Sequence, residues 1–207
     1  MQFRRFLLMA AAVAPMVGLM AQGAKADPIS ASEAQAFITT AGQQMAGIVN
    51  GPGNQQSRAT ALRTLVNQIV AVSQVGDYVL GRYINIATAA QHTQFQDLFH
   101  QLLAYNITYQ IKAYQGVSFV VNGTKPQGDD VVVDTTVTTP GHPPADVGWV
   151  VEEVGGKPQI IDVIVAGTSL RITTRNDYAS VITDNGGNVS ALLNAMQHQI
   201  QKLSADS

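Results

Sequence analysis

The most informative pattern lies in the second half of the chain, where apolar residues stop recurring at helical spacing and begin to alternate. Residues 147–154 and 159–165 are two β-rich runs joined by Gly-Gly-Lys-Pro at residues 155–158. Such runs around a glycine-rich turn predict a β-hairpin. Two earlier runs, residues 117–121 and 131–138, predict strands on either side of a polar turn segment at residues 122–129. Short links between sequential strands predict an antiparallel meander of four, curved by its own twist.

The last of these strands has no fully polar face. By simple alternation, Ile161, Val163 and Val165 share one face, and Asp162 lies on the other between two isoleucines. Both faces of the sheet therefore need apolar cover, either from helices or from a ligand.

Helical periodicity flanks the strands on both sides. Ser30 and Glu33 form a capping-box pattern before a helix that ends near residue 49, and Thr88 and Gln91 form another before a long helix that ends near residue 113. Further helices are expected within residues 62–70, 76–83, 174–183 and 189–203. The order of helices, four strands and helices predicts an α+β fold, with N- and C-terminal helices packed against a curved antiparallel sheet.

The first 26 residues have the pattern of a secretory signal peptide. Arg4 and Arg5 precede an apolar run, and Ala24-Lys25-Ala26 provides a cleavage site. We therefore expect export to the periplasm and a mature domain over residues 27–207. Removing this segment leaves 9 of the 12 basic residues against all 14 acidic ones, a net charge of −5. That balance does not suit a nucleic-acid binder, so no nucleic-acid partner is expected.

Catalytic and metal-binding motifs are absent from the sequence. The chain has no cysteine, its four histidines show no metal-ligand spacing, and no Gly-rich nucleotide motif is present. We accordingly expect no metal, no cofactor and no enzyme activity. Asp162 and Ser169 could join a distant histidine in a triad, but a serine after a strand more simply caps the next turn. A buried Asp162 would then accept backbone donors or pair with Arg171 or Arg175.

Three stretches are distinctive when taken together and in order: GDYVLGRY at residues 76–83, IDVIVAGTSL at residues 161–170 and TRNDY at residues 174–178. They resemble the MlaC, or toluene-tolerance, family of periplasmic lipid-binding proteins that serve ABC-type lipid transport systems. Thr88, Gln91, Phe95, Phe99 and the Leu102-Leu103 and Leu192-Leu193 pairs continue the resemblance, which spans nearly the whole mature chain.

The resemblance implies an NTF2-like or cystatin-like fold that holds lipid acyl chains in an apolar cavity between the curved sheet and the helices. It further implies phospholipid, or a hopanoid-like lipid, as ligand, and an inner-membrane ABC transporter complex and an outer-membrane lipoprotein complex as partners. Arg82, Arg171 and Arg175 could contact the headgroup or an aspartate. From strand alternation and helix facing, the candidate lipid-binding residues are Leu102, Tyr105, Tyr109, Phe119, Val147, Trp149, Ile161, Val163 and Val165.

Two other functions stay open on the sequence alone. One is a small enzyme in an NTF2-like cavity, with Asp162 or Asp134 as general base on an apolar substrate. The other is an exported adaptor with a closed core that binds only proteins.

Overall fold

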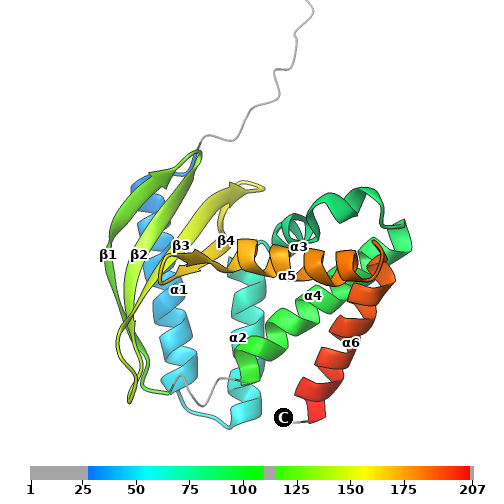
Figure 1. Ribbon diagram of the computed structural model, residues 1–207. Helices are drawn as coiled ribbons and strands as arrows, with labels where there is room; N and C mark the ends of the chain where they lie inside the picture. The colour runs from blue at the N-terminus through cyan, green and yellow to red at the C-terminus, as the bar shows by residue number, and fades with distance from the viewer. Residues whose placement is uncertain (1–27, 110–114, 206–207) are drawn as a thin grey trace, which may run out of the picture.

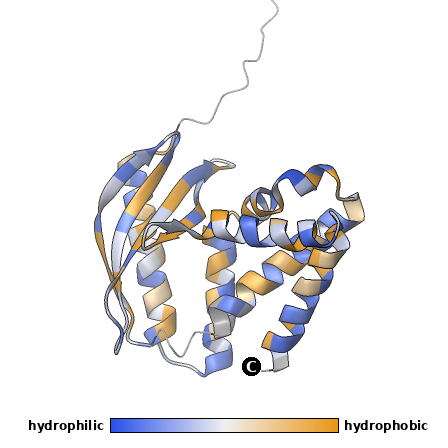
Figure 2. Ribbon diagram, in the orientation of Figure 1, coloured by the Kyte–Doolittle hydropathy of each residue, from blue (hydrophilic) through white to orange (hydrophobic). Residues whose placement is uncertain are grey.

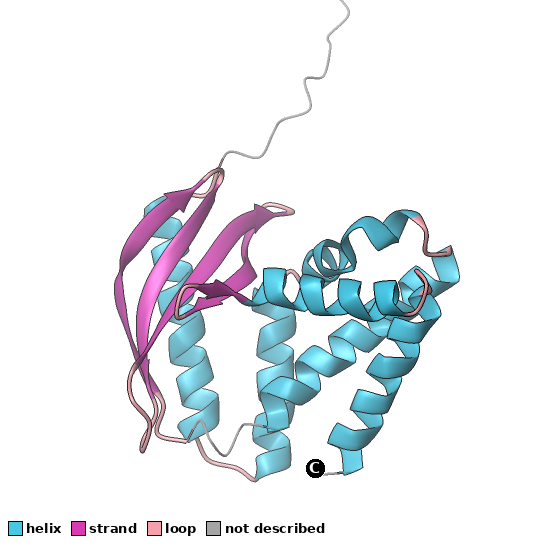
Figure 3. Ribbon diagram, in the orientation of Figure 1, coloured by secondary structure: helices cyan, strands magenta, loops and turns pink. Residues whose placement is uncertain are grey.

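The computed structural model describes residues 28–109 and 115–205, without the side chains of residues 107–109 and 205. The expected signal peptide, residues 1–26, lies outside this part of the chain. Figures 1 and 3 show the strands gathered on one side of the molecule and most of the helices on the other. None of the helices in the described part is long and apolar enough to cross a membrane.

The sheet contains the predicted meander of four antiparallel strands and one short addition. The strands follow in sequence order, and each pairs antiparallel with the next. They are β1 (Ser118–Gln127), β2 (Asp130–Thr138), β3 (Ala145–Val154), β4 (Lys157–Val165) and the two-residue β5 (Thr168–Ser169). The sheet is open, so β1 forms a free edge.

The first strand is longer than its sequence indicates. Residues 122–129 were predicted as a turn because of their glycines and Pro126, but β1 continues to Gln127. The pairing with β2 shifts between Val121 and Gly123, which accommodates one extra residue. Pro126 is tolerated because an edge strand has one side with no hydrogen-bonding partner.

The helices are close to those predicted. They are α1 (Ala31–Asn50), α2 (Gln55–Ile69), α3 (Val72–Leu80), the 3-10 helix η1 (Gly81–Asn85), α4 (Ala89–Tyr109), α5 (Leu170–Asp184) and α6 (Val189–Ala205). Both predicted capping boxes are present: the Glu33 backbone N donates to Ser30 Oγ at 3.2 Å, and the Gln91 backbone N donates to Thr88 Oγ1 at 3.2 Å. The predicted end of the long helix, near residue 113, lies outside the described residues.

One face of the sheet, which we call the inner face, packs against α1 and α2. Its fully buried part contains strand residues from β2, β3 and β4 together with apolar residues of both helices. The strand members are Val131, Val133, Val151 and Ile160, each at most 6% exposed. Because every apolar side chain removed from water stabilises the fold by roughly 1.5–3 kcal/mol, this layer holds α1 and α2 on the sheet.

The opposite, outer face has its buried apolar residues where it approaches α3. Val132, Val150 and Ile161 are buried there against Ala71, at the start of that helix. Nearer the free edge the same face is more exposed and carries an ion pair, in which Lys125 Nζ lies 2.6 Å from Asp134 Oδ2. Both faces thus receive apolar cover at β3 and β4, as the sequence predicted.

A separate core lies within the helical half, between η1 and helices α3 to α6. Phe95 is fully buried at its centre, stacked on Phe99 with ring centroids 5.9 Å apart and met edge-on by Tyr178 at 6.1 Å. Figure 2 shows apolar residues, in orange, along α4 and α6. This core has no buried residue in common with those of the sheet.

Tyr178 makes this core sensitive to alkaline pH. Burial raises the pKa of Tyr178 to about 12, against 10.0 for an unperturbed tyrosine. The unfolded chain therefore releases this proton first, so the stabilising effect of a neutral Tyr178 is complete below pH 10 and is lost as the pH rises from 10 to 12. At full ionisation we expect a loss of about 3 kcal/mol in the free energy of unfolding. Urea titrations of wild type and Tyr178→Phe at pH 8 and pH 11.5 measure this loss. Between these pH values the variant should lose less stability than wild type, and equal losses would contradict the role of Tyr178.

Candidate functional site

Five of the candidate residues lie together on the inner face, beyond its fully buried part. Strand pairing places Val147 beside Val165, Trp149 beside Val163, and Phe119 beside Val137. All five candidates, Phe119, Val147, Trp149, Val163 and Val165, are only half-buried. We call this group the inner-face patch. Apolar side chains that face the helices without being fully enclosed are suited to contact an apolar ligand.

The polar atoms within the patch are already satisfied. Trp149 Nε1 donates to Thr135 Oγ1 at 2.9 Å, and Thr135 Oγ1 donates to the carbonyl oxygen of Val147 at 3.0 Å. Thr135 is only 1% exposed. Because the indole N–H and the threonine hydroxyl have their partners inside the protein, a hydrocarbon chain could cover Trp149 without leaving a polar group unbonded.

The edge of the patch is set by a close approach of α1. A Cβ atom at Gly42 would lie 2.3 Å from the ring of Phe119, far inside normal contact distance. Glycine at this position therefore lets the aromatic ring lie directly against the backbone of α1. The sequence analysis did not single out Gly42, since a glycine inside a helix gives no sign of which side chain it faces.

The other four candidates are not part of this group. Leu102 is 3% exposed within the helical core, and Tyr105 is half-buried near the end of α4. The side chain of Tyr109 lies outside the described residues. Ile161 was predicted to share a face with Val163, and this is wrong: Val150 pairs with Asp162 and Val151 with Ile160, so Ile161 is an unpaired extra residue. The resulting bulge turns Ile161 to the outer face.

Asp162 has the structural role that the sequence favoured over catalysis. It is 6% exposed, and its Oδ1 accepts from the backbone N of Val163 at 2.8 Å and of Arg171 at 3.0 Å. Ser169 Oγ donates to Asp162 Oδ2 at 2.5 Å and accepts from the backbone N of Ile172 at 3.0 Å. The carboxylate and Ser169, which caps α5, thus fasten the start of this helix to β4. α5 begins at Leu170, four residues before the predicted start.

No histidine among the described residues bonds to Asp162 or Ser169, so the triad considered from the sequence is not formed. Asp134, the other candidate base, is paired with Lys125. Within the described part of the chain, His, Cys, Asp and Glu form no group of three that could hold a metal ion.

Two arginines from the start of α5 lie over the ring of Tyr78 on α3, and a third arginine lies on η1. The Arg171 guanidinium lies 4.2 Å from the Tyr78 ring centroid and 3.8 Å from Asp162 Oδ2, and the Arg175 guanidinium lies 5.1 Å from the same ring. Arg82 donates instead to the Tyr83 hydroxyl at 2.9 Å. Among the described residues, neither Arg82 nor Arg175 is paired with a carboxylate. The sequence suggested Arg171 or Arg175 as the partner of Asp162, and in the structure the partner is Arg171.

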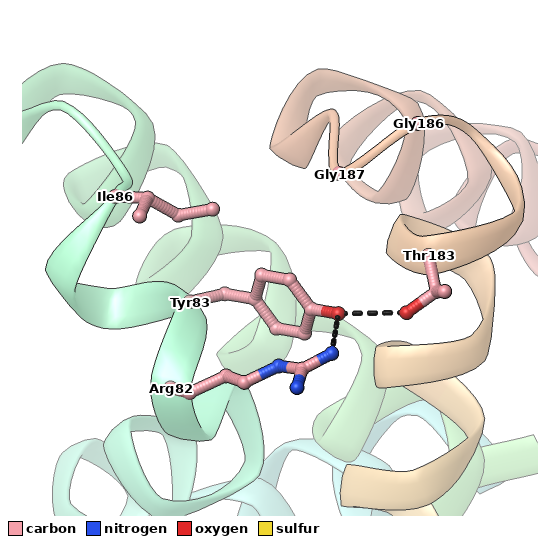
Figure 4. A pocket seen from close by; sticks show the side chains of 6 residues that line it. All are labelled: Arg82, Tyr83, Ile86, Thr183, Gly186 and Gly187. Carbon is pink, nitrogen blue, oxygen red and sulfur yellow. Dashed lines mark hydrogen bonds between the residues drawn. The ribbon is translucent and has the colours of Figure 1, made fainter.

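Two surface hollows follow the line where η1 and the end of α3 meet α5. One, of about 440 Å³, is lined by Arg82, Tyr83, Ile86, Thr183, Gly186 and Gly187, which Figure 4 shows. The other, of about 410 Å³, adds residues from α3 and α5, among them Tyr78, Ile172, Arg175 and Asn176. Arg82 and Tyr83 line both hollows, so the two adjoin each other. We call them together the α3–α5 groove.

Tyr83 forms the floor shared by the two hollows. It is 6% exposed, and its hydroxyl lies 2.8 Å from Thr183 Oγ1 on α5 and accepts from Arg82 Nη2 (Figure 4). The hydrogen bonds with Thr183 and with Arg82 lower the pKa of Tyr83 below its usual value. These bonds connect η1 to α5 and hold Arg82 at the groove with its guanidinium accessible to solvent.

Comparison with known proteins agrees with this architecture. The chain matches the family model described as MlaC protein over residues 39–198. A phospholipid-binding protein from Ralstonia solanacearum, solved in complex with a phospholipid, has a similar fold, with a TM-score of 0.73 and 24% sequence identity. The match covers 83% of this chain and 99% of that one. The protein therefore belongs to the MlaC family, as the resemblance in its sequence predicted.

Proposed function

We propose that this protein is a periplasmic carrier that binds the acyl chains of a phospholipid against the inner-face patch. The observation that carries the proposal is the patch itself: five half-buried apolar side chains on one sheet face, with the nearby indole and hydroxyl groups already bonded. Membership of the MlaC family and the similar fold of a phospholipid-bound protein support it. The apolar cavity expected between sheet and helices is part of this proposal, as is a single lipid-binding domain over residues 27–207.

The energetics suit a carrier better than a permanent store. Two acyl tails of about 16 carbons each, at ~0.8 kcal/mol per buried methylene, give on the order of 25 kcal/mol of gross burial. Most of this replaces burial that the same tails already have in a bilayer, so transfer between membrane and protein is close to balance. The direction of transport must then come from partners, for which we propose an inner-membrane ABC transporter complex and an outer-membrane lipoprotein complex.

The first test is whether the purified protein contains lipid. Native mass spectrometry of the protein isolated from the periplasm should show a mass increment that extraction identifies as intact phospholipid. A hopanoid-like lipid is the alternative ligand, and the extracted species distinguishes the two. Protein that stays lipid-free after incubation with phospholipid vesicles and its transport partners would contradict the proposal.

A pair of matched variants tests where the tails bind. Val163→Trp adds bulk to the inner-face patch without adding charge, so we expect the bound phospholipid to fall by at least about half because the ring occupies space needed by the tails. Val120→Trp is the control, because Val120 is 63% exposed and its partner Thr136 places it on the outer face. Lipid per protein, measured by phosphate assay after extraction, should be unchanged in the control. Equal lipid content in both variants would place the tails elsewhere.

A further inference from the structure

The α3–α5 groove combines exposed apolar residues with unpaired cations. Five large apolar residues are exposed in the described part of the chain, and four of them lie on η1, just after it, or in the first turn of α5. Two of the four line the groove: Ile86, 59% exposed, and Ile172, 48% exposed. Arg82 and Arg175 also line the groove and have no carboxylate partner among the described residues.

The charge along α5 is divided between two sides of the helix. Ile172, Arg175 and Ala179 follow helical spacing and all line the groove. Asp177 and Asp184 are exposed and lie seven residues apart, so they share a different side of α5, about 150° away from these three residues by helical geometry. The side of α5 that lines the groove therefore carries a positive charge, and the acidic residues of the helix lie on another side. This is notable because the whole chain has more acidic than basic residues.

We propose that the α3–α5 groove docks the protein on the surface of a bilayer that contains anionic phospholipid. Guanidinium groups form two parallel hydrogen bonds to a phosphate, so Arg82 and Arg175 suit lipid headgroups. Ile86 and Ile172 line the same groove and are exposed, so they would be the side chains that enter the interfacial region of the bilayer. The bond from Arg82 to Tyr83 leaves donors on its guanidinium for a phosphate, since an arginine has five N–H groups.

This docking goes beyond lipid carriage and does not depend on it. The inner-face patch and the groove share no residue, so lipid content and membrane binding can be measured separately. Docking would bring the protein to the leaflet where its cargo is collected or delivered.

Co-sedimentation with vesicles tests the proposal directly. Wild-type protein should bind vesicles of phosphatidylcholine with 30% phosphatidylglycerol and bind pure phosphatidylcholine weakly, and added salt should reduce the binding. Each arginine near an anionic surface contributes on the order of 5-fold in affinity, so Arg82→Gln with Arg175→Gln should bind about 30-fold more weakly. Ile86→Ser with Ile172→Ser should weaken binding to both kinds of vesicle.

The control removes the same charge elsewhere. Lys157 and Lys202 are exposed and do not line the groove, so Lys157→Gln with Lys202→Gln should bind anionic vesicles like wild type. Circular dichroism and lipid content should match wild type in every variant. The proposal would be overturned if wild-type protein did not bind anionic vesicles, or if the lysine and arginine variants lost the same amount of binding. It would also be overturned if the groove bound a purified protein partner but no vesicles. A lipid-free protein that still docks would count against the proposed function alone.

Discussion

Replacing Asp162 by alanine is expected to lower the free energy of unfolding by about 3–5 kcal/mol, because it leaves the partly buried Arg171 without its ion-pair partner and three hydrogen-bond donors without their acceptor. The two backbone N–H groups of Val163 and Arg171 and the Ser169 hydroxyl all donate to this carboxylate. Without them the start of α5 loses its attachment to β4. For a chain of this length, the melting temperature should fall by roughly 2–4 °C for each kcal/mol.

Urea denaturation followed by circular dichroism measures this effect. Asp162→Asn keeps an oxygen that can accept from the two backbone groups, so it should lose clearly less stability than the alanine variant. Asp177→Ala, at an exposed position on the same helix, is the matched control and should stay within about 0.5 kcal/mol of wild type. An alanine variant as stable as wild type would show that Asp162 is not a structural clamp and would favour the general-base hypothesis.

The second large effect is expected in the helical core, where Phe95→Ala should cost about 3–5 kcal/mol. The ring is fully buried, and its removal would leave a cavity bordered by Phe99 and Tyr178, which belong to the same core. The two ring contacts account for part of this loss, since aromatic pairs contribute beyond their buried area.

The comparison that isolates the cavity is Phe95→Leu, which refills most of the volume and should lose less stability than the alanine variant. Val120→Ala, at a position 63% exposed, should change the free energy of unfolding little. Thermal and urea unfolding should agree on this order. A loss below about 1 kcal/mol for Phe95→Ala would mean that the core collapses around the missing ring.

The features that the sequence predicts well depend only on residues close together in the chain. Ser30 and Thr88 act within one helical turn, so their patterns located two helix starts correctly. The run at residues 131–138 likewise identified β2, because successive residues of a strand point to opposite faces of the sheet and the apolar residues there follow that alternation in part. The family resemblance and the α+β order are also confirmed.

The errors arise where a residue's role depends on distant partners. Ile161 changes face because its strand pairs with β3 through a bulge, and nothing within β4 alone shows this. β1 extends through a glycine and Pro126 because it lies at the sheet edge, which depends on the order of the strands. The α3–α5 groove exists only because two segments about 90 residues apart pack with Tyr83 bonded to Thr183.

The contact between Gly42 and Phe119 gives α1 a fixed clearance above the sheet. A methyl group added at Gly42 would overlap the Phe119 ring, so either the ring would have to rotate away or α1 would have to move away from β1. The spacing between α1 and β1 at this point therefore depends on the absence of a side chain at residue 42. Substitutions of increasing size at Gly42 could be used to change that spacing in small steps.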